Sequence, residues 1–156
     1  MQLEGSCHCG AVRFGLASQT PYPYMRCYCS ICRKTAGGGG FAINLGADSA
    51  SLKIDSEIDT GVYHAVVDGK MSPAERHFCP RCASALWVYD PRWPELLHPF
   101  ASAIDSELPR PPERTHLMLG SKAGWVEVEA GAGDKCFDEY PDESIAQWHQ
   151  RLQLTQ

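Results

Sequence analysis

The sequence lacks any stretch of about 18 apolar residues, which is the length that a membrane-spanning helix requires. Its first residues, Met1–Gly5, contain neither the basic region nor the apolar core of a secretory signal peptide. Basic residues are not in excess either, since the formal net charge is −5. Proteins that bind nucleic acid in general present a basic face. These absences favour a cytoplasmic protein that spans no membrane and binds no nucleic acid.

A chain of 156 residues has the length of one domain, so we expect a single domain over residues 1–156. Its 14 glycines and 11 prolines indicate short elements and many turns. Apolar residues and their alternation predict short strands at 11–16, 24–26, 41–45, 51–55, 61–67, 85–89, 115–119 and 125–129. Asp68 and Gly69 predict a hairpin turn. The chain is therefore predicted to be mainly β.

Two other stretches do not fit the strand pattern. The segment from Pro91 to Pro112 is rich in proline, which predicts an irregular surface segment with at most a short strand near Phe100. One helix is predicted at the C-terminus, where Ile145, Trp148 and Leu152 recur at helical spacing. Asp142 or Ser144 is expected as its N-cap.

The cysteines are the most informative residues. Without an export signal, clustered cysteines bind metal more often than they form disulfides. The eight cysteines form two doublets, one triplet and a lone residue: Cys7 and Cys9, Cys79 and Cys82, then Cys27, Cys29 and Cys32, and Cys136. The simplest arrangement joins the two doublets into one closed site of four thiolates, which is typical of structural zinc.

The triplet leaves the fourth position of a tetrahedral zinc undecided. That position could hold an exchangeable ligand, or one of the three thiols could stay free. It could also be closed by one of these residues: Cys136, His8, His64, His77, His98 or His116. A zinc ion with three thiolates carries a net charge of −1, which disfavours formation of hydroxide. Such an ion is better suited to hold an incoming thiolate.

The residues around the triplet suggest room for a small ligand. Glycines 37–40 have no side chains to block it, and the backbone amides of Gly37 and Gly38 could contact a peptide-like thiol. A flexible turn is the alternative. Lys34 is a further candidate contact. Several basic residues flank the cysteine motifs and could form a basic rim suited to an anion, or be ordinary surface charge: Arg26, Arg33, Lys34, Arg76 and Arg81.

Three motifs together resemble the glutathione-dependent formaldehyde-activating enzyme family, which also includes centromere protein V. They are Gly5–Phe14, Cys27–Lys34 followed by Gly37, and Arg76–Cys82. Weaker likeness continues at Ala103–Asp105, His116 and Ser121–Trp125, to about residue 129. Two residues depart from the family pattern: Ala83 replaces a usual glycine, and Gly124 replaces a usual proline. The tail from about 131 to 156 has no counterpart.

The resemblance implies a β-tent of short antiparallel sheets organised around zinc, with two zinc ions. It implies a structural ion on Cys7, Cys9, Cys79 and Cys82, and a catalytic ion on Cys27, Cys29 and Cys32. The implied activity is that of a carbon–sulfur lyase of the S-hydroxymethylglutathione synthase type. Such an enzyme joins glutathione to formaldehyde, or performs the reverse reaction. The alternative is a non-catalytic, zinc-containing thiol carrier or protein-binding module.

Overall fold

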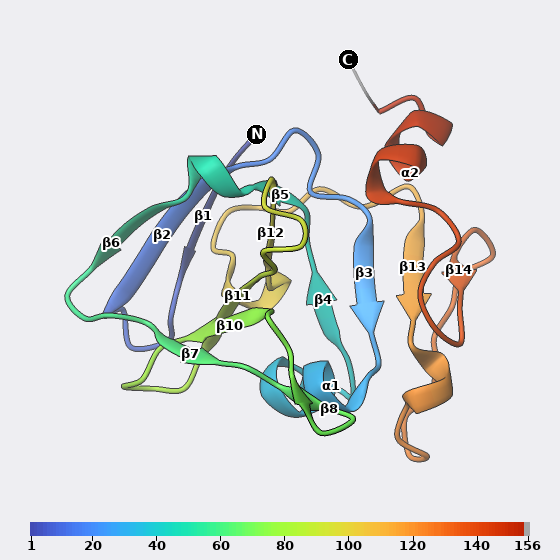
Figure 1. Cartoon of the computed structure of the whole chain (residues 1–156). Coiled ribbons are helices and arrows are strands. Elements are labelled where there is room, and N and C mark those ends of the chain that lie inside the picture. The colour runs from blue at the N-terminus through green and yellow to red at the C-terminus, as the bar shows by residue number, and fades with distance from the viewer. Residues whose placement is uncertain (155–156) are drawn as a thin grey trace. The chain divides into compact units, whose positions relative to one another are not determined.

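The computed structural model describes residues 1–154, and its secondary structure is mainly β, as the sequence predicted (Figure 1). The chain divides into two compact units. The first unit combines residues 1–19 with 46–108, and the second combines 20–45 with the residues from 109 onward. Each cysteine cluster lies within one unit. The expectation of a single domain over 1–156 stays a prediction.

The first unit contains two antiparallel sheets and a hairpin. The smaller sheet has the order β1 (Gln2–Ser6), β2 (Val12–Ala17), β6 (Lys53–Ser56). The larger has the order β5 (Ala47–Asp48), β12 (Leu96–Pro99), β11 (Ala85–Tyr89), β10 (Glu75–Phe78), β7 (Gly61–Tyr63). The hairpin joins β8 (Val66–Val67) to β9 (Lys70–Met71). Short 3-10 turns are η1 (Ser49–Ser51) and η2 (Ala101–Ala103).

The core of the first unit follows from strand alternation. Val12, Phe14 and Leu16 of β2 are buried, as their spacing predicted. Phe14 meets Trp87 of β11 edge to face, with ring centroids 5.0 Å apart. Cys7 and Cys79 belong to the same buried cluster. The connections that carry the cysteine doublets are therefore anchored in the core.

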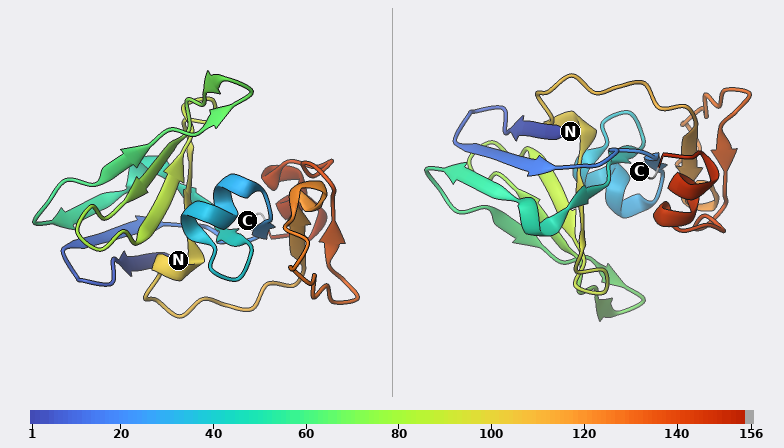
Figure 2. Two further views of the ribbon diagram at one scale, coloured as in Figure 1. Left: turned by 90° about the horizontal axis from the view of Figure 1, so that it is seen from below. Right: turned by 90° about the horizontal axis from the view of Figure 1, so that it is seen from above.

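The second unit has one sheet, with the order β14 (Lys135–Cys136), β13 (Arg114–Leu117), β3 (Tyr24–Cys27), β4 (Ala42–Asn44). β13 runs parallel to both neighbours, whereas β3 and β4 are antiparallel. The other elements are α1 (Ser30–Ala36), η3 (Leu119–Ser121) and α2 (Ile145–Arg151). In both views of Figure 2 the C-terminal segment (red) stays beside β13.

Several sequence predictions are confirmed. Asp68 and Gly69 form the hairpin turn between β8 and β9, with φ of 51° and 74°. Ser144 is the N-cap of α2. It forms a capping box with Gln147, because the hydroxyl accepts the Gln147 amide while the Gln147 side chain accepts the Ser144 amide.

Other expectations were wrong. The residues 125–129 form no strand, although they alternate. The Val126 amide instead donates to the carbonyl of Ala123 in a turn. In the proline-rich segment the short strand expected near Phe100 is present as β12, but its Leu97 is buried between β11 and β5, so this part of the segment is not at the surface. Helix α1 was not predicted. It begins after Cys29, whose sulfur accepts the Cys32 amide as an N-cap.

Candidate metal centres

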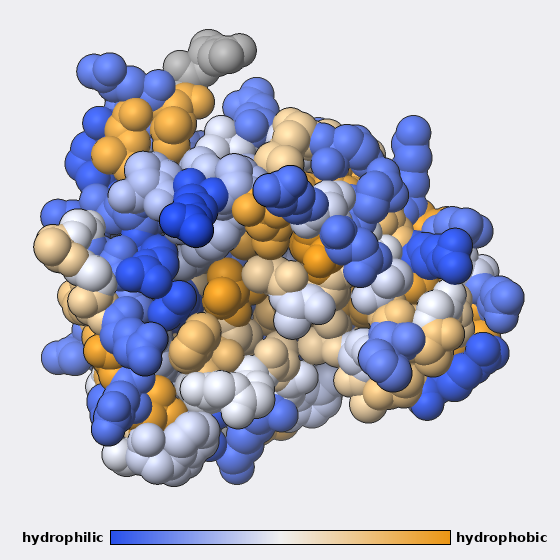
Figure 3. Space-filling view, turned by 180° about the vertical axis from the view of Figure 1, so that it is seen from behind, coloured by the Kyte–Doolittle hydropathy of each residue, from blue (hydrophilic) through white to orange (hydrophobic). Residues whose placement is uncertain are grey.

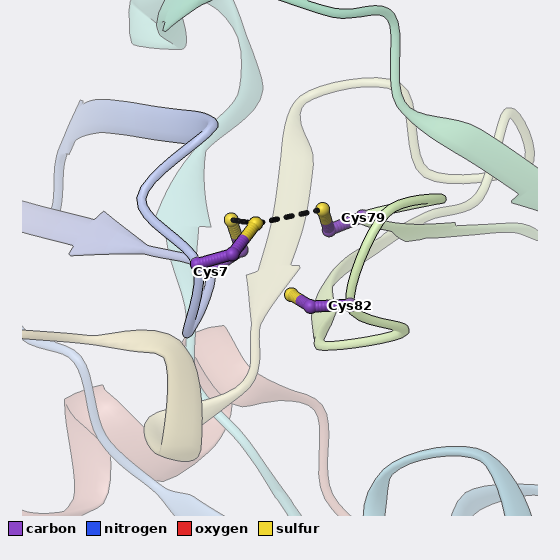
Figure 4. A group of neighbouring side chains, drawn as sticks. Cys7, Cys79 and Cys82 are labelled. Atoms are coloured by element: carbon purple, nitrogen blue, oxygen red, sulfur yellow. Dashed lines mark hydrogen bonds between the residues drawn. The ribbon is translucent and has the colours of Figure 1, made fainter.

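The two cysteine doublets converge in the first unit. Cys7 and Cys9 lie in the connection between β1 and β2, and Cys79 and Cys82 lie between β10 and β11 (Figure 4). All four sulfurs lie within 4.8 Å of one another. The Cys7 and Cys9 sulfurs are 3.5 Å apart, and those of Cys9 and Cys79 are 3.8 Å apart. A tetrahedral zinc with bonds of about 2.3 Å places its sulfurs about 3.8 Å apart. The donor set and spacing therefore fit a closed four-thiolate metal site.

Backbone geometry holds this cluster in place. The Val12 amide donates to the Cys7 sulfur at 3.3 Å. The Ala83 amide donates to the Cys79 carbonyl at 2.8 Å, which closes the turn containing Cys79 and Cys82. Ala83 has φ of 61°, in the left-handed region. A family glycine would occupy this conformation without the roughly 1–2 kcal/mol cost of a β-carbon. The departure from the family pattern strains the turn but removes no sulfur.

The triplet gathers at the junction of β3 and α1 in the second unit. Cys27 ends β3, Cys29 caps α1, and Cys32 lies in its first turn, so the local chain alone brings their sulfurs within 4.8 Å. Cys27 and Cys32 are buried, whereas Cys29 is partly exposed. Three convergent thiols with one partly exposed member could hold a metal ion that keeps an accessible side.

The three thiols are electrostatically unequal. Hydrogen bonds from the thiols of Cys27 and Cys32, together with backbone amides, lower the pKa of Cys29 to about 2. Hydrogen bonding to Cys29 and Cys32, together with burial, raises the pKa of Cys27. Negative charge is therefore favoured first on Cys29, which is the most exposed of the three residues.

The structure argues against most candidates for a fourth ligand. Within the described part of the second unit, no further Cys, His, Asp or Glu joins the triplet cluster. Cys136 is exposed on β14 and lies outside it. His116 is fully buried, with Nδ1 3.0 Å from the Tyr28 hydroxyl and Nε2 3.2 Å from Asp134. Both of its nitrogens are therefore occupied.

The histidines of the first unit that have assigned contacts also serve structural roles. His77 stacks on Trp87 and contacts the Thr60 hydroxyl and the Glu75 carboxylate. His64 hydrogen-bonds the carbonyl of Ser72. Neither belongs to a group of side chains with metal-binding geometry among residues 1–154.

The three residues predicted to contact substrate differ in packing and exposure. Gly37 is needed for packing, because a β-carbon there would overlap the backbone of Phe41. Gly38 is exposed, and a β-carbon there would meet nothing within 4 Å. Lys34 is exposed on α1. Contacts of Gly37, Gly38 and Lys34 with a thiol ligand stay a prediction.

The basic residues near the cysteine motifs differ in burial and in their contacts. In the second unit, the guanidinium of Arg26 lies 5.0 Å from the centre of the Phe41 ring. The Nε atoms of Arg26 and Arg33 are buried without a hydrogen-bond partner. In the first unit, Arg81 lies 3.7 Å from Glu57 on the surface. A basic rim drawn from both units stays a prediction.

The sequence did not reveal Tyr28, His116 and Asp134 as a connected group. His116 lies on β13, and Asp134 is 18 residues further along the chain. No spacing rule links them to Tyr28, because a parallel strand pair brings them together.

No helix among residues 1–154 has the length and apolar character needed to cross a membrane. The face shown in Figure 3 mixes hydrophilic residues (blue) with smaller apolar areas (orange).

The fold and the two clusters define a class of small, mainly β proteins with one four-cysteine and one three-cysteine centre. A family model described as glutathione-dependent formaldehyde-activating enzyme matches residues 2–118, and the chain belongs to this family.

Two known proteins are similar to this chain, one by sequence and name and one by fold. A protein of Halomonas elongata, provisionally named a glutathione-dependent formaldehyde-activating enzyme, is 68% identical over 154 residues, which cover 99% of this chain and 98% of that protein. The crystal structure of a Rhodobacter sphaeroides protein superposes with a TM-score of 0.54 at 25% identity. That match covers 70% of this chain and 93% of the other.

Proposed function

We propose that this protein adds a small thiol such as glutathione to a small aldehyde such as formaldehyde, or performs the reverse reaction, with zinc bound at the cysteine triplet. The observation that carries the proposal is the partly exposed cluster of Cys27, Cys29 and Cys32, which no fourth side chain of its described unit completes. The family match and the name of the Halomonas elongata relative support the choice of glutathione and formaldehyde.

The reaction needs no oxidant. The sulfur of the thiol forms a bond to the carbonyl carbon, the C=O π pair moves to oxygen, and the proton of the thiol ends on that oxygen. With glutathione and formaldehyde the product is S-hydroxymethylglutathione. In reverse, the C–S bond breaks and the proton returns to sulfur.

The two centres have different roles in this proposal, one catalytic and one structural. A zinc ion at the triplet would supply a positive centre that lowers the pKa of an incoming thiol and orients its sulfur. Cys27, Cys29 and Cys32 would hold that ion. The buried Cys27 and Cys32 keep water from one side, and the partly exposed Cys29 marks the side open to substrate. The four-cysteine centre of the first unit would hold a second, structural zinc.

The proposal is tested by exchange spectroscopy. The rate of exchange between free glutathione and S-hydroxymethylglutathione is measured by NMR in the presence of formaldehyde, with metal content counted beforehand. We expect the wild-type protein and a Cys136→Ser control to accelerate exchange, and Cys29→Ser to return it to the uncatalysed rate. A wild-type protein with both centres loaded that leaves the rate unchanged would overturn the proposal.

A thiol carrier without catalysis is the second candidate. It is favoured by the position of Tyr28, whose hydroxyl is close to the triplet in sequence but is buried against His116. That hydroxyl is therefore not available to protonate a product. Calorimetry that detects glutathione binding, together with unchanged exchange rates in the NMR experiment, would identify a carrier.

A further inference from the structure

Two linked hydrogen bonds, one buried and one partly buried, connect the triplet loop with the C-terminal segment. Tyr28 and His116 are both fully buried. The Tyr28 hydroxyl lies 3.0 Å from His116 Nδ1, and His116 Nε2 lies 3.2 Å from Asp134 Oδ2. The two rings also stack, with centroids 5.9 Å apart. The sequence positions of these residues do not place them together, so the contact is a product of the tertiary fold.

The donor and the acceptor in each of these two hydrogen bonds can be assigned. Asp134 accepts the amides of Arg114 and Gly131 at 3.0 and 2.8 Å, and its carboxylate lies 2.9 Å from Arg114 Nε. Burial opposes ionisation of Asp134, but these donors outweigh it and hold the pKa of the carboxyl below its usual range. An ionised carboxylate only accepts, so His116 Nε2 carries a proton. Burial lowers the pKa of His116 and keeps the ring neutral, so Nδ1 is the acceptor. The Tyr28 hydroxyl therefore donates to His116.

Tyr28 connects these hydrogen bonds to the cysteine triplet. Tyr28 stands between Cys27 and Cys29, and its amide donates to the Leu117 carbonyl at 3.0 Å. The side chain is fixed at its hydroxyl, and the ring packs on Phe41 with centroids 5.1 Å apart. A residue held at both its backbone and its side-chain end limits the directions in which its neighbours can point. The sulfurs of Cys27 and Cys29 are those neighbours.

We propose that His116 and Asp134 are positioning residues for the triplet: they orient Tyr28, and through it the sulfurs of Cys27 and Cys29. This inference rests on the proposed binding of metal at the triplet. Asp134 lies beyond residues 2–118, which are the part that the family model matches. On this proposal, the C-terminal segment beyond the part matched by the family model supports the second centre.

The test measures the metal site directly in the full chain. Cobalt(II) is titrated into the metal-free protein, and the absorption of the triplet is isolated by subtracting the spectrum of Cys29→Ser. Tyr28→Phe removes the donated hydrogen bond but keeps the ring. Asp134→Asn removes the charge that fixes the tautomer of His116. We expect both variants to shift the cobalt d–d bands and to weaken cobalt binding at the triplet about 10-fold, as partners outside the ligand set commonly do.

Tyr24→Phe is the matched control. Tyr24 begins β3, four residues before Tyr28, and its hydroxyl donates to the Pro109 carbonyl at 2.7 Å, away from the Tyr28–His116–Asp134 hydrogen bonds. Tyr24→Phe should lose stability without changing the cobalt spectrum or the cobalt affinity of the triplet. If Tyr28 had a merely structural role, Tyr28→Phe would likewise leave the spectrum and the affinity unchanged.

The outcomes separate the two proposals. An unchanged spectrum and affinity in Tyr28→Phe, with two cobalt equivalents bound by the wild type, would overturn this inference alone. A wild type that takes up one equivalent would overturn the proposed function and this inference with it. If Asp134→Asn does not fold, Tyr28→Phe decides.

Discussion

At the scale of single residues, Gly37 shows how one feature can have two physical meanings. The glycine run suggested an open path for a ligand, yet a β-carbon on Gly37 would overlap the Phe41 backbone. Gly40 is constrained too, with φ of 93° and Val126 against it. Only the exposed Gly38 and Gly39 have free space. The run is therefore partly a packing requirement and partly an open surface.

This difference predicts unequal effects on stability for substitutions at Gly37 and Gly38. Gly37→Ala should lower the free energy of unfolding by about 1–3 kcal/mol, because the new methyl group forces the Phe41 backbone to move. Gly38→Ala is the control and should change it by about 0.5 kcal/mol or less. Urea unfolding followed by circular dichroism measures both. Equal stabilities of the two variants would contradict the packing role of Gly37.

At the scale of elements, one carboxylate of the second unit binds two side chains of helix α2. Glu113 accepts the indole NH of Trp148 at 2.9 Å and the guanidinium of Arg151 at 2.6 and 3.1 Å. The hydrogen bonds from Arg151 hold the pKa of Glu113 below its usual range, despite burial. The buried Trp148 places the rest of the helix against the sheet.

The lowered pKa predicts a pH dependence with a definite sign. Glu113 is ionised in the folded state at pH values where the unfolded chain, with a pKa of about 4.3, begins to bind protons. Its stabilising contribution is therefore complete above about pH 4.3 and is lost as pH falls through the lower folded pKa. We expect Glu113→Gln to be less stable than wild type at pH 7, and the difference to shrink below about pH 4.3.

Thermal unfolding at a series of pH values measures this difference. Comparing variant with wild type at each pH cancels the loss of metal in acid, which both proteins share. Glu129→Gln, at an exposed position, should match the wild type throughout. A difference between Glu113→Gln and wild type that stays constant down to pH 3 would contradict the assignment.

At the scale of the whole molecule, the two cysteine centres are expected to differ in what they support. Cys79 is fully buried in the core of the first unit, and its connection packs with the strands around Trp87. The triplet is assembled by a short local segment, and its sheet has other sources of stability. Loss of a thiol should therefore have unequal consequences.

We expect Cys79→Ser to lose cooperative unfolding and the metal of the first unit. Cys29→Ser should remain folded and retain one metal equivalent of two. Metal analysis and near-ultraviolet circular dichroism, which reports buried aromatic residues such as Trp87, measure both effects. Equal destabilisation by the two substitutions would indicate that both centres are structural.

The sequence by itself determined the local features of this protein. Strand β2 follows from alternation, because its period of two matches the pleat of a sheet. The capping box of α2 and the turn at Asp68 and Gly69 are short-range patterns with short-range causes. The cysteine spacing predicted the triplet and each doublet, since thiols two or three residues apart must lie close together. The two doublets are about 70 residues apart, so their meeting in one cluster was a pairing hypothesis that the tertiary structure bears out. These motifs also carried the resemblance that the family match confirmed.

The tertiary structure decided what depends on long-range pairing. The residues 125–129 alternate but find no strand partner, so alternation alone did not make a strand. Parallel pairing of β13 with β3 brings His116 to Tyr28, and the chain beyond it then brings Asp134 to His116. Both nitrogens of His116 are occupied for that reason. Whether a histidine serves as a ligand or as a support depends on its neighbours in space, and the order of residues along the chain does not give those neighbours.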